Sequence, residues 1–296
     1  MKFLPENIDS QDLINCLRNI NLEILDLLKY YYQRASSDDD FQKKLNIKNS
    51  SSGPVTSADI KLNQLIIKNL KQNYPLQKWG IVSEESNKNQ VNLEFQNDWI
   101  WIIDPLDGTK DFINNTGEYA VHIALTFKKS VVLSNVLIPQ KHESWFYVKG
   151  IGTWAESKIE KNIPLKKINS KQLKEMVVVT SRNHIPKELS VILNKLNPLR
   201  IVGMGSIGYK AISIIKGEAD LYISYAEKGK SCPKDWDMAA PSSIIRGAGG
   251  HFTDVHGSNI EFLKNDNYEQ GGIILSSMNK NHQGLCKEIL ENLKNI

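Results

Sequence analysis

The most informative stretch of this 296-residue chain reads Trp101-Ile102-Ile103-Asp104-Pro105-Leu106-Asp107-Gly108-Thr109. The apolar run that leads into it begins at Trp99, and such a run is typical of a strand buried on both faces of a sheet. Proline and glycine favour a turn directly after the strand. A turn there can direct both aspartates and the Leu106 carbonyl to the same side, and Mg²⁺ prefers oxygen ligands of this kind. The stretch therefore predicts part of a metal site at the end of a buried strand.

Three further acidic residues lie where a helix or strand is expected to begin or end. Glu84 follows a short apolar strand, and Asp237 lies at the start of a helix expected over 236–248. Asp59 stands three residues after Thr56, which is the spacing of a capping box at a helix start. For any one of these acids alone, a turn or a helix cap is the better interpretation. Glu84 and Asp237 could nevertheless converge with the two aspartates above, and a hard cation such as Mg²⁺ needs clustered oxygen ligands.

Hydrophobic periodicity predicts the order of the other elements. In the first half we expect helices at 13–28 and 60–70 and strands at 79–82, 99–103, 119–127, 131–138 and 144–148. The polar segment at 35–52 is predicted to be a mobile loop. In the second half we expect strands at 176–180, 200–202, 220–225, 251–254 and 273–276, and helices at 187–196, 206–216, 236–248 and 281–293. This order predicts an α/β fold of stacked layers, with halves 1–170 and 171–296 forming one compact unit.

Composition and charge exclude several classes of protein. The formal net charge is +4 with lysines spread along the chain, whereas nucleic-acid-binding proteins usually carry a clustered basic face. No stretch approaches the roughly 20 apolar residues that span a bilayer, and the N-terminus lacks the apolar run of a secretory signal. Cys16, Cys232 and Cys286 form no CxxC pair, so reduced thiols are expected. We therefore expect a cytoplasmic protein with no nucleic-acid partner and no integral membrane segment.

Two motifs carry a family resemblance. The stretch from Trp101 to Thr109, followed downstream by Trp236-Asp237-Met238-Ala239-Ala240, resembles the paired signature of the inositol monophosphatase superfamily. Its members are lithium-sensitive, magnesium-dependent phosphatases with a layered αβαβα fold. The resemblance extends from Pro54 to about His282. Within the superfamily the chain is most similar to the 3'(2'),5'-bisphosphate nucleotidases, through the segments 54–59, 83–85, 180–184, 205–210 and 235–241.

The resemblance implies a site that holds two or three Mg²⁺ ions. Glu84, Asp104 and the Leu106 carbonyl would hold the first ion. Asp104, Asp107 and Asp237 would hold the second, so that Asp104 bridges the two. Among the catalytic residues, which the resemblance gives as Asp59, Thr109 and Glu84, Asp59 would orient the Thr109 hydroxyl. That hydroxyl would then accept a proton from the attacking water, a role that depends on a hydrogen bond to Asp59.

The resemblance also implies a set of substrate contacts. Arg182 and His184 would suit a second phosphate or a ribose, because arginine presents paired donors to phosphate. The backbone N–H groups of Gly108 and Thr109 could contact a phosphate oxygen. The remaining candidates lie at the starts of expected helices: Ser206, Lys210 and Asp237. For Arg182 the alternative is an ordinary surface arginine, and for the glycine-rich segment at 205–208 it is a plain turn.

The function that this resemblance implies is removal of the 3'-phosphate of 3'-phosphoadenosine 5'-phosphate, giving AMP and phosphate. One alternative is an inositol phosphate or sugar bisphosphate phosphatase of the same fold, and another is a non-catalytic protein that binds phosphorylated metabolites. Three departures from the family pattern concern the substrate more than the metal. Ser83 stands where many relatives have glycine, Asn183 replaces a serine, and the segment 228–234 is unusually basic.

Overall fold

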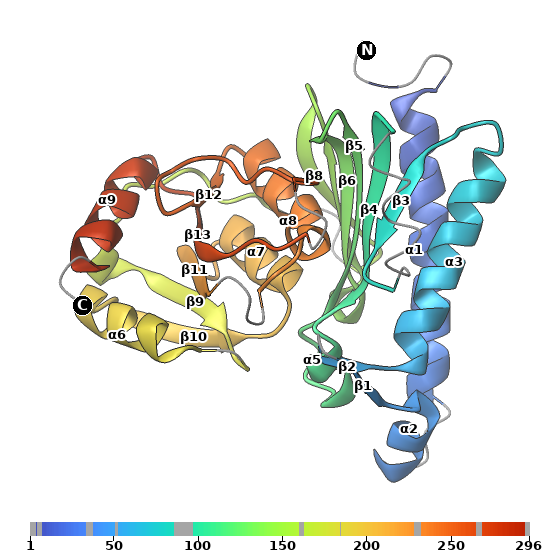
Figure 1. Cartoon of the computed structure of the whole chain (residues 1–296), viewed down its shortest axis with the longest axis horizontal. Coiled ribbons are helices and arrows are strands. Elements are labelled where there is room, and N and C mark those ends of the chain that lie inside the picture. Colours follow the sequence, from blue (N-terminus) through green and yellow to red (C-terminus); the bar gives the residue numbers. More distant parts are fainter. Residues whose placement is uncertain are drawn as a thin grey trace.

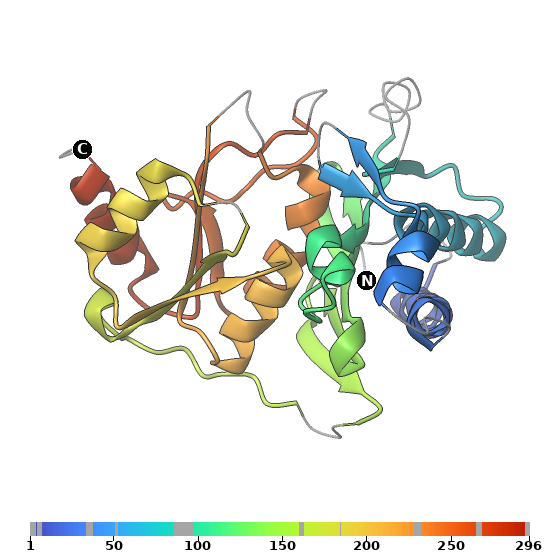
Figure 2. The ribbon, with the colours of Figure 1, turned by 90° about the horizontal axis from the view of Figure 1, so that it is seen from below.

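Two β-sheets lie on either side of a helix pair, α7 (Ile207–Lys216) and α8 (Asp235–Gly247), as Figure 1 shows. The computed structural model describes residues 4, 8–33, 38–50, 53–85, 97–159, 163–183, 185–227, 232–264 and 268–293. Further helices cover the outer face of each sheet, and Figure 2 shows the same alternation of layers from below. This αβαβα layering confirms the predicted α/β fold.

The first sheet has six strands in chain order. They are β3 (Gly80–Ser83), β4 (Trp99–Asp107), β5 (Ala120–Phe127), β6 (Ser130–Ile138), β7 (Glu143–Val148) and β8 (Gly152–Ser157). β3 runs parallel to β4, and every later neighbour is antiparallel. The sequence prediction missed β8, because all its residues are only partly buried at the sheet edge and its apolar pattern is weak.

The second sheet has the strand order β10-β9-β11-β13-β12. Its strands are β9 (Val177–Ser181), β10 (Arg200–Met204), β11 (Leu221–Ala226), β12 (His251–Asp254) and β13 (Gly272–Ser277). β9 pairs in parallel with both β10 and β11, and β13 pairs antiparallel with β11 and β12. α6 (Lys187–Leu196) and α9 (His282–Leu293) cover its outer face. Every predicted element of this half is present within a few residues of its expected ends.

The outer face of the first sheet is covered by α1 (Ser10–Gln33) and α3 (Ser57–Asn73). The positions of α1 that recur every three or four residues are fully buried, as predicted: Leu13, Leu17, Ile20 and Ile24. α3 begins with the predicted capping box. The Thr56 hydroxyl accepts the N–H of Asp59, and the Asp59 carboxylate accepts the N–H of Thr56 at 2.8 Å.

The prediction of a loop at 35–52 is wrong for the residues that the structure describes. They form α2 (Asp38–Leu45) and β1 (Lys48–Ser50), which pairs with β2 (Gly53–Val55). Phe41 and Leu45 are buried one helical turn apart, and the Phe41 ring contacts that of Phe112 with centroids 5.8 Å apart. The polar composition hid this helix, because the apolar partner that stabilises it lies far away in the sequence.

Pro241 lies inside α8, six residues after the first helical residue, Asp235. Proline has no N–H, so the carbonyl of Asp237, four residues earlier, loses its usual helical partner. Asp237 itself is the third residue of α8 and does lie at the helix start, as predicted.

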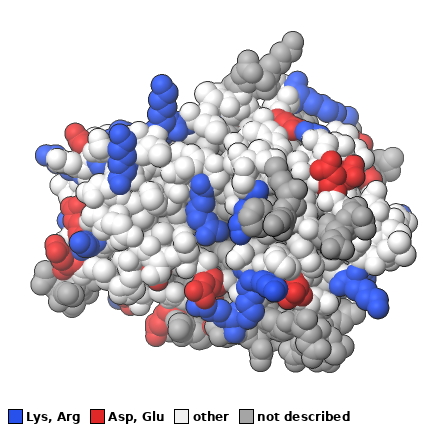
Figure 3. Space-filling view, turned by 90° about the horizontal axis from the view of Figure 1, so that it is seen from above, with Lys and Arg blue, Asp and Glu red and all other residues white. Residues whose placement is uncertain are grey.

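The surface of the molecule agrees with the sequence. On the face shown in Figure 3, the described basic side chains stand at several separate places among acidic ones. No helix among the described residues combines the length and apolarity needed to cross a membrane. The three cysteines are free and buried.

Candidate active site

A bulge in β4 sets the direction of its two aspartates. Asp104 pairs with His122 of β5, but Asp107 pairs with Ala120, so three steps along β4 face two steps along β5. Side chains three apart on a regular strand point to opposite faces. The extra residue cancels this alternation and brings both carboxylates to one side. The turn expected directly after Ile103 comes later, at Gly108, whose φ of 90° suits glycine.

Three aspartates meet at this point. One carboxylate oxygen from each of Asp104, Asp107 and Asp237 lies within 4.8 Å of the other two. The first two residues come from β4, and Asp237 comes from the first turn of α8, where its carboxylate accepts the N–H of Lys234 at 2.5 Å. Acids that lie 130 residues apart in the chain thus converge at the contact between the first sheet and α8.

Glu84 joins the same group. It follows β3, and its N–H donates to the Ile103 carbonyl of β4 at 3.2 Å, which continues the pairing of the two strands. The negative charges of Glu84 and Asp104 act on each other, so the two carboxyl groups are near neighbours.

The acids of this group raise each other's pKa values. Burial raises the pKa of Glu84 well above its usual range, and the negative charge of Asp237 raises it further. Burial and the charge of Glu84 do the same to the pKa of Asp104. For Asp237, burial and the charge of Asp107 raise the pKa to about 7. The cluster is therefore short of positive charge, and its donors are all oxygens, so it fits a hard divalent cation such as Mg²⁺.

Asp59 and Thr109 lie beside this cluster. The Thr109 hydroxyl lies 3.0 Å from an Asp59 carboxylate oxygen and 3.1 Å from the Leu106 carbonyl, and can donate to either. The other Asp59 oxygen accepts the N–H and the hydroxyl of Thr56. Burial raises the pKa of Asp59, although these hydrogen bonds oppose the shift. The contact on which the predicted role of Thr109 depends is present.

Two neighbours of Asp107 escaped the sequence analysis. The N–H of Gly208 in α7 donates to Asp107 Oδ2 at 3.1 Å, and His122 Nε2 lies 3.3 Å from the same oxygen. His122 is fully buried, and its other ring nitrogen lies 3.4 Å from the Trp236 carbonyl. A Cβ at position 208 would lie 2.2 Å from His122 Nε2, so the close approach requires glycine. A lone histidine within the apolar run of β5 was the available signal.

The candidate substrate residues have varied surroundings. Ser206 is buried, and its hydroxyl caps α7 by accepting the N–H of Tyr209 at 2.9 Å. Lys210 is buried too, and its ammonium donates to the Gly205 carbonyl. Burial lowers the pKa of Lys210 to about 8, against the charge of Asp107. Gly108 and Thr109 lie at the start of the short helix α5 (Thr109–Ile113).

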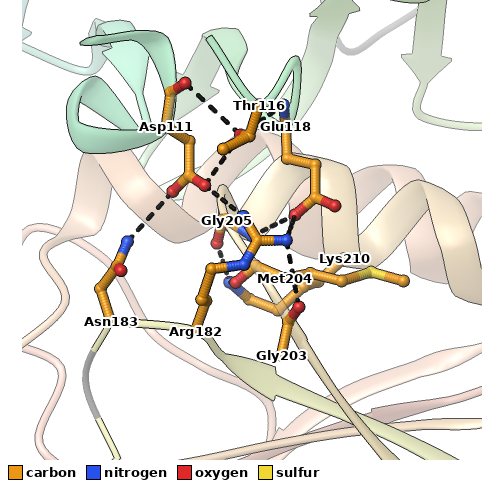
Figure 4. Close-up of polar contacts among 9 residues, drawn as sticks. All are labelled: Asp111, Thr116, Glu118, Arg182, Asn183, Gly203, Met204, Gly205 and Lys210. Atoms are coloured by element: carbon orange, nitrogen blue, oxygen red, sulfur yellow. Dashed lines mark hydrogen bonds and ion pairs between the residues drawn. The ribbon is translucent and has the colours of Figure 1, made fainter. Parts of the chain in front are cut away.

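The other two candidates were expected at the second phosphate. Arg182 already makes ion pairs with Asp111 and Glu118, as Figure 4 shows. His184 lies outside the described residues, as does most of the basic segment at 228–234.

Comparison with known proteins places this geometry among phosphatases. The family model described as "Inositol monophosphatase family" matches residues 9–294. The 3'(2'),5'-bisphosphate nucleotidase CysQ of Salmonella typhimurium is 29% identical over 74% of this chain and 83% of its own length. Inositol monophosphatase 1 of Sus scrofa is 25% identical over 84% of this chain and 86% of its own length. The solved structure of an IMPase from Thermotoga maritima matches with a TM-score of 0.73 at 21% identity, covering 96% of this chain and 99% of that one.

Proposed function

Because the chain belongs to the inositol monophosphatase family, we propose that it is a magnesium-dependent 3'(2'),5'-bisphosphate nucleotidase. The reaction would convert 3'-phosphoadenosine 5'-phosphate and water to AMP and phosphate. The observation that supports a phosphatase is the convergence of one carboxylate oxygen each from Asp104, Asp107 and Asp237 within 4.8 Å, with the charge of Glu84 acting on Asp104. Support for the nucleotide substrate comes from the relatives named bisphosphate nucleotidase, at 29% and 30% identity.

The metal ligands in this proposal come from the acidic cluster. Glu84, Asp104 and the Leu106 carbonyl would hold one ion, and Asp104, Asp107 and Asp237 would hold another. Bound there, Mg²⁺ would lower the pKa of water and neutralise the charge that develops on the leaving oxygen.

Asp59 and Thr109 would move the proton. The Thr109 hydroxyl would pass its proton to Asp59 Oδ1, 3.0 Å away, as it accepts one from the attacking water. Burial prepares Asp59 for this step, because the raised pKa makes it a better proton acceptor. The hydroxyl and N–H of Thr56 fix its other oxygen, so that Oδ1 keeps facing Thr109.

The first rival is a phosphatase for inositol phosphates or sugar bisphosphates. The match to the porcine inositol monophosphatase favours it, with 84% of this chain covered. The second rival is a non-catalytic protein that binds phosphorylated metabolites. Such a protein has no need of the complete acidic cluster that this chain carries, and we rank it last.

A substrate panel separates these functions. Phosphate release is measured from 3'-phosphoadenosine 5'-phosphate, inositol 1-phosphate and fructose 1,6-bisphosphate, with Mg²⁺ and with EDTA. We expect the nucleotide to have the highest kcat/KM by at least about tenfold, and EDTA to abolish release. A preference for inositol 1-phosphate or the sugar would establish the first rival. Binding of a substrate without turnover would establish the second. The Asp107→Ala variant, expected to be inactive on all three, controls for contaminating phosphatases.

A further inference from the structure

Arg182 connects the two halves of the molecule. It follows β9 of the second sheet, and its N–H donates to the Met204 carbonyl of β10 at 2.9 Å. Its guanidinium reaches across to the first half, with Nη1 2.5 Å from Asp111 of α5 and Nη2 2.7 Å from Glu118 (Figure 4). We call Arg182, Asp111 and Glu118 the clasp.

The carboxylates of the clasp have further partners. Asp111 is 3% exposed and also accepts the Thr116 hydroxyl at 2.9 Å and the Asn183 amide at 3.2 Å. Asn183 is one of the three departures from the family pattern, and its amide adds a contact between the halves. Glu118 accepts the N–H of Gly205 at 2.8 Å through the oxygen that also faces Arg182.

The clasp holds the turn between β10 and α7. Besides the Gly205 contact, the N–H of Ser206 donates to the Glu118 carbonyl at 2.9 Å. A Cβ on Gly205 would lie 2.3 Å from that carbonyl oxygen and 2.6 Å from Asp111 Cγ. The turn is therefore packed against the clasp without room for a side chain.

The turn at Gly205 is connected to Asp107 through the start of α7. The N–H of Gly208, at the start of that helix, donates to Asp107 Oδ2 at 3.1 Å. A displacement of the turn would move that donor and release one constraint on a proposed metal ligand. Ligand orientation of this kind typically changes metal affinity or activity about 10–100-fold.

The charges of the clasp argue against direct phosphate binding by Arg182. Its guanidinium faces two carboxylates, so an approaching phosphate meets a group whose charge is already neutralised. To bind phosphate, Arg182 would have to leave Asp111, which is too buried to be compensated by water.

We propose that Arg182 is a positioning residue, which acts through Glu118 and the turn at Gly205 to fix α7 and Asp107. This inference replaces the expected contact with the second phosphate, and it rests on the proposed function for the reaction that Asp107 serves. Its structural part, the link from Arg182 to the metal site, can be measured without any substrate.

The first experiment compares Arg182→Met with a matched control, Arg18→Met. Arg18 makes a similar two-bond ion pair with Glu156, at 2.8 and 2.6 Å, on the far side of the first sheet. Hydrogen exchange of the amides at 204–210 and the Mg²⁺ concentration for half-maximal thermal stabilisation are measured in both. We expect only Arg182→Met to speed exchange and to raise the Mg²⁺ requirement, by about tenfold. Unchanged exchange and Mg²⁺ response would overturn the proposal.

The second experiment uses kinetics on a bisphosphate and a monophosphate, taken from the substrates that the wild type hydrolyses. Positioning predicts that Arg182→Met lowers kcat by a similar factor, about tenfold or more, for both substrates. It also predicts that adding Glu118→Gln causes little further loss, because both residues act through one turn. A raised KM for the bisphosphate alone, with normal kcat, would show that Arg182 binds phosphate and would overturn the proposal.

The design separates this inference from the proposed function. If no substrate is hydrolysed, the proposed function fails while the exchange and Mg²⁺ measurements still decide the role of Arg182. If Arg182→Met does not fold, Arg182→Lys keeps the charge but lacks the fork that reaches both carboxylates. We then expect the same effects at smaller size, and a wild-type result for Arg182→Lys in all measurements would contradict the proposal.

Discussion

Asp220 and the acids of the candidate site are all buried, but their neighbours differ. Lysines lie beside Asp220, whereas other carboxylates lie beside the acids of the site. Asp220 is 3% exposed, and it accepts hydrogen bonds from Lys166 at 2.6 Å and Lys171 at 2.9 Å. Burial alone would raise its pKa, yet these bonds and the N–H of Val177 outweigh burial and lower it. At the site, burial and mutual repulsion raise the pKa values of Glu84, Asp104 and Asp237.

This difference distinguishes Asp220, whose charge stabilises the fold, from the acids of the candidate site, whose charges favour binding of a cation. Around Asp220 the protein supplies the cations itself, so the group stabilises the fold without help. Around Asp104 the protein gathers carboxylates instead, which costs stability unless a cation from solution binds. Buried acids with raised pKa values that share one place are therefore better markers of function than buried acids as such.

The largest effect that tests this contrast is the loss of activity in Asp104→Asn. This change removes the carboxylate proposed to bridge both ions, so we expect kcat to fall about a thousandfold or more. The metal-free protein should be as stable as the wild type or more stable, because one repelling charge is gone. Activity with saturating Mg²⁺ and calorimetry in EDTA measure the two effects. A clear drop in the Tm of the metal-free variant would mean that Asp104 stabilises the fold as Asp220 does, and would contradict the contrast.

Asp220→Asn should give the opposite result. Removing this carboxylate leaves two lysines without their partner, and breaking a buried pair costs about 3 kcal/mol of unfolding free energy. For a chain of this size that lowers Tm by several degrees. Thermal unfolding and kcat at 25 °C are the measurements. A folded variant that has lost activity would mean that Asp220 serves the reaction and not only the fold.

The pH dependence of stability sharpens the contrast further. The raised pKa of Asp237, about 7, means that this group favours the fold while protonated, and that this contribution fades as pH rises from about 4 to 7. Between pH 5 and 7.5 the metal-free wild type should therefore lose a few degrees of Tm relative to Asp237→Asn. The pKa of Asp220 is lowered, so its contribution to stability is lost only at pH values below the usual pKa of Asp. That contribution is therefore constant between about pH 5 and 7.5.

Mg²⁺ provides the control for that measurement. It should raise the wild-type Tm more at pH 7.5 than at pH 5, since protons compete with the ion at the lower pH. Parallel Tm curves for the wild type and Asp237→Asn, with or without Mg²⁺, would show that the site acids carry no excess charge.

The smallest expected effect is that of Lys171→Met. Lys171 is 43% exposed, whereas Lys166, the other partner of Asp220, is 18% exposed. With Lys166 still present, we expect a loss of less than about 1 kcal/mol in urea unfolding. Lys166→Met should cost more, because it removes the more buried cation. Equal losses for the two variants would mean that the exposed fraction of a lysine does not determine how much it contributes to stability.

The sequence predicted those parts of the structure that depend on local pattern. The buried strand before Asp104, the capping box at Thr56 and the alternating second half all follow from propensity and periodicity, and each is present. The family resemblance added the acids that belong together, including Asp237, which no local pattern could connect to Asp104.

The missed features depend on contacts between distant residues. α2 forms because Phe41 finds Phe112, and the direction of Asp107 depends on a bulge opposite β5. The role first given to Arg182 was inferred from the family resemblance and from the type of its side chain. Its carboxylate partners lie 71 and 64 residues away in the chain, and only the fold brings them into contact.

The division of the acids between the two halves has a consequence for biosynthesis. Glu84, Asp104 and Asp107 leave the ribosome early, but Asp237 follows only when four-fifths of the 296 residues have been translated. A nascent chain without α8 also lacks the helix that covers the inner face of the first sheet. Because domains form from the N-terminus onward during translation, the cluster of acids becomes complete only late in synthesis. We therefore expect an incomplete chain without α8 to lack the fourth acid of the proposed metal site.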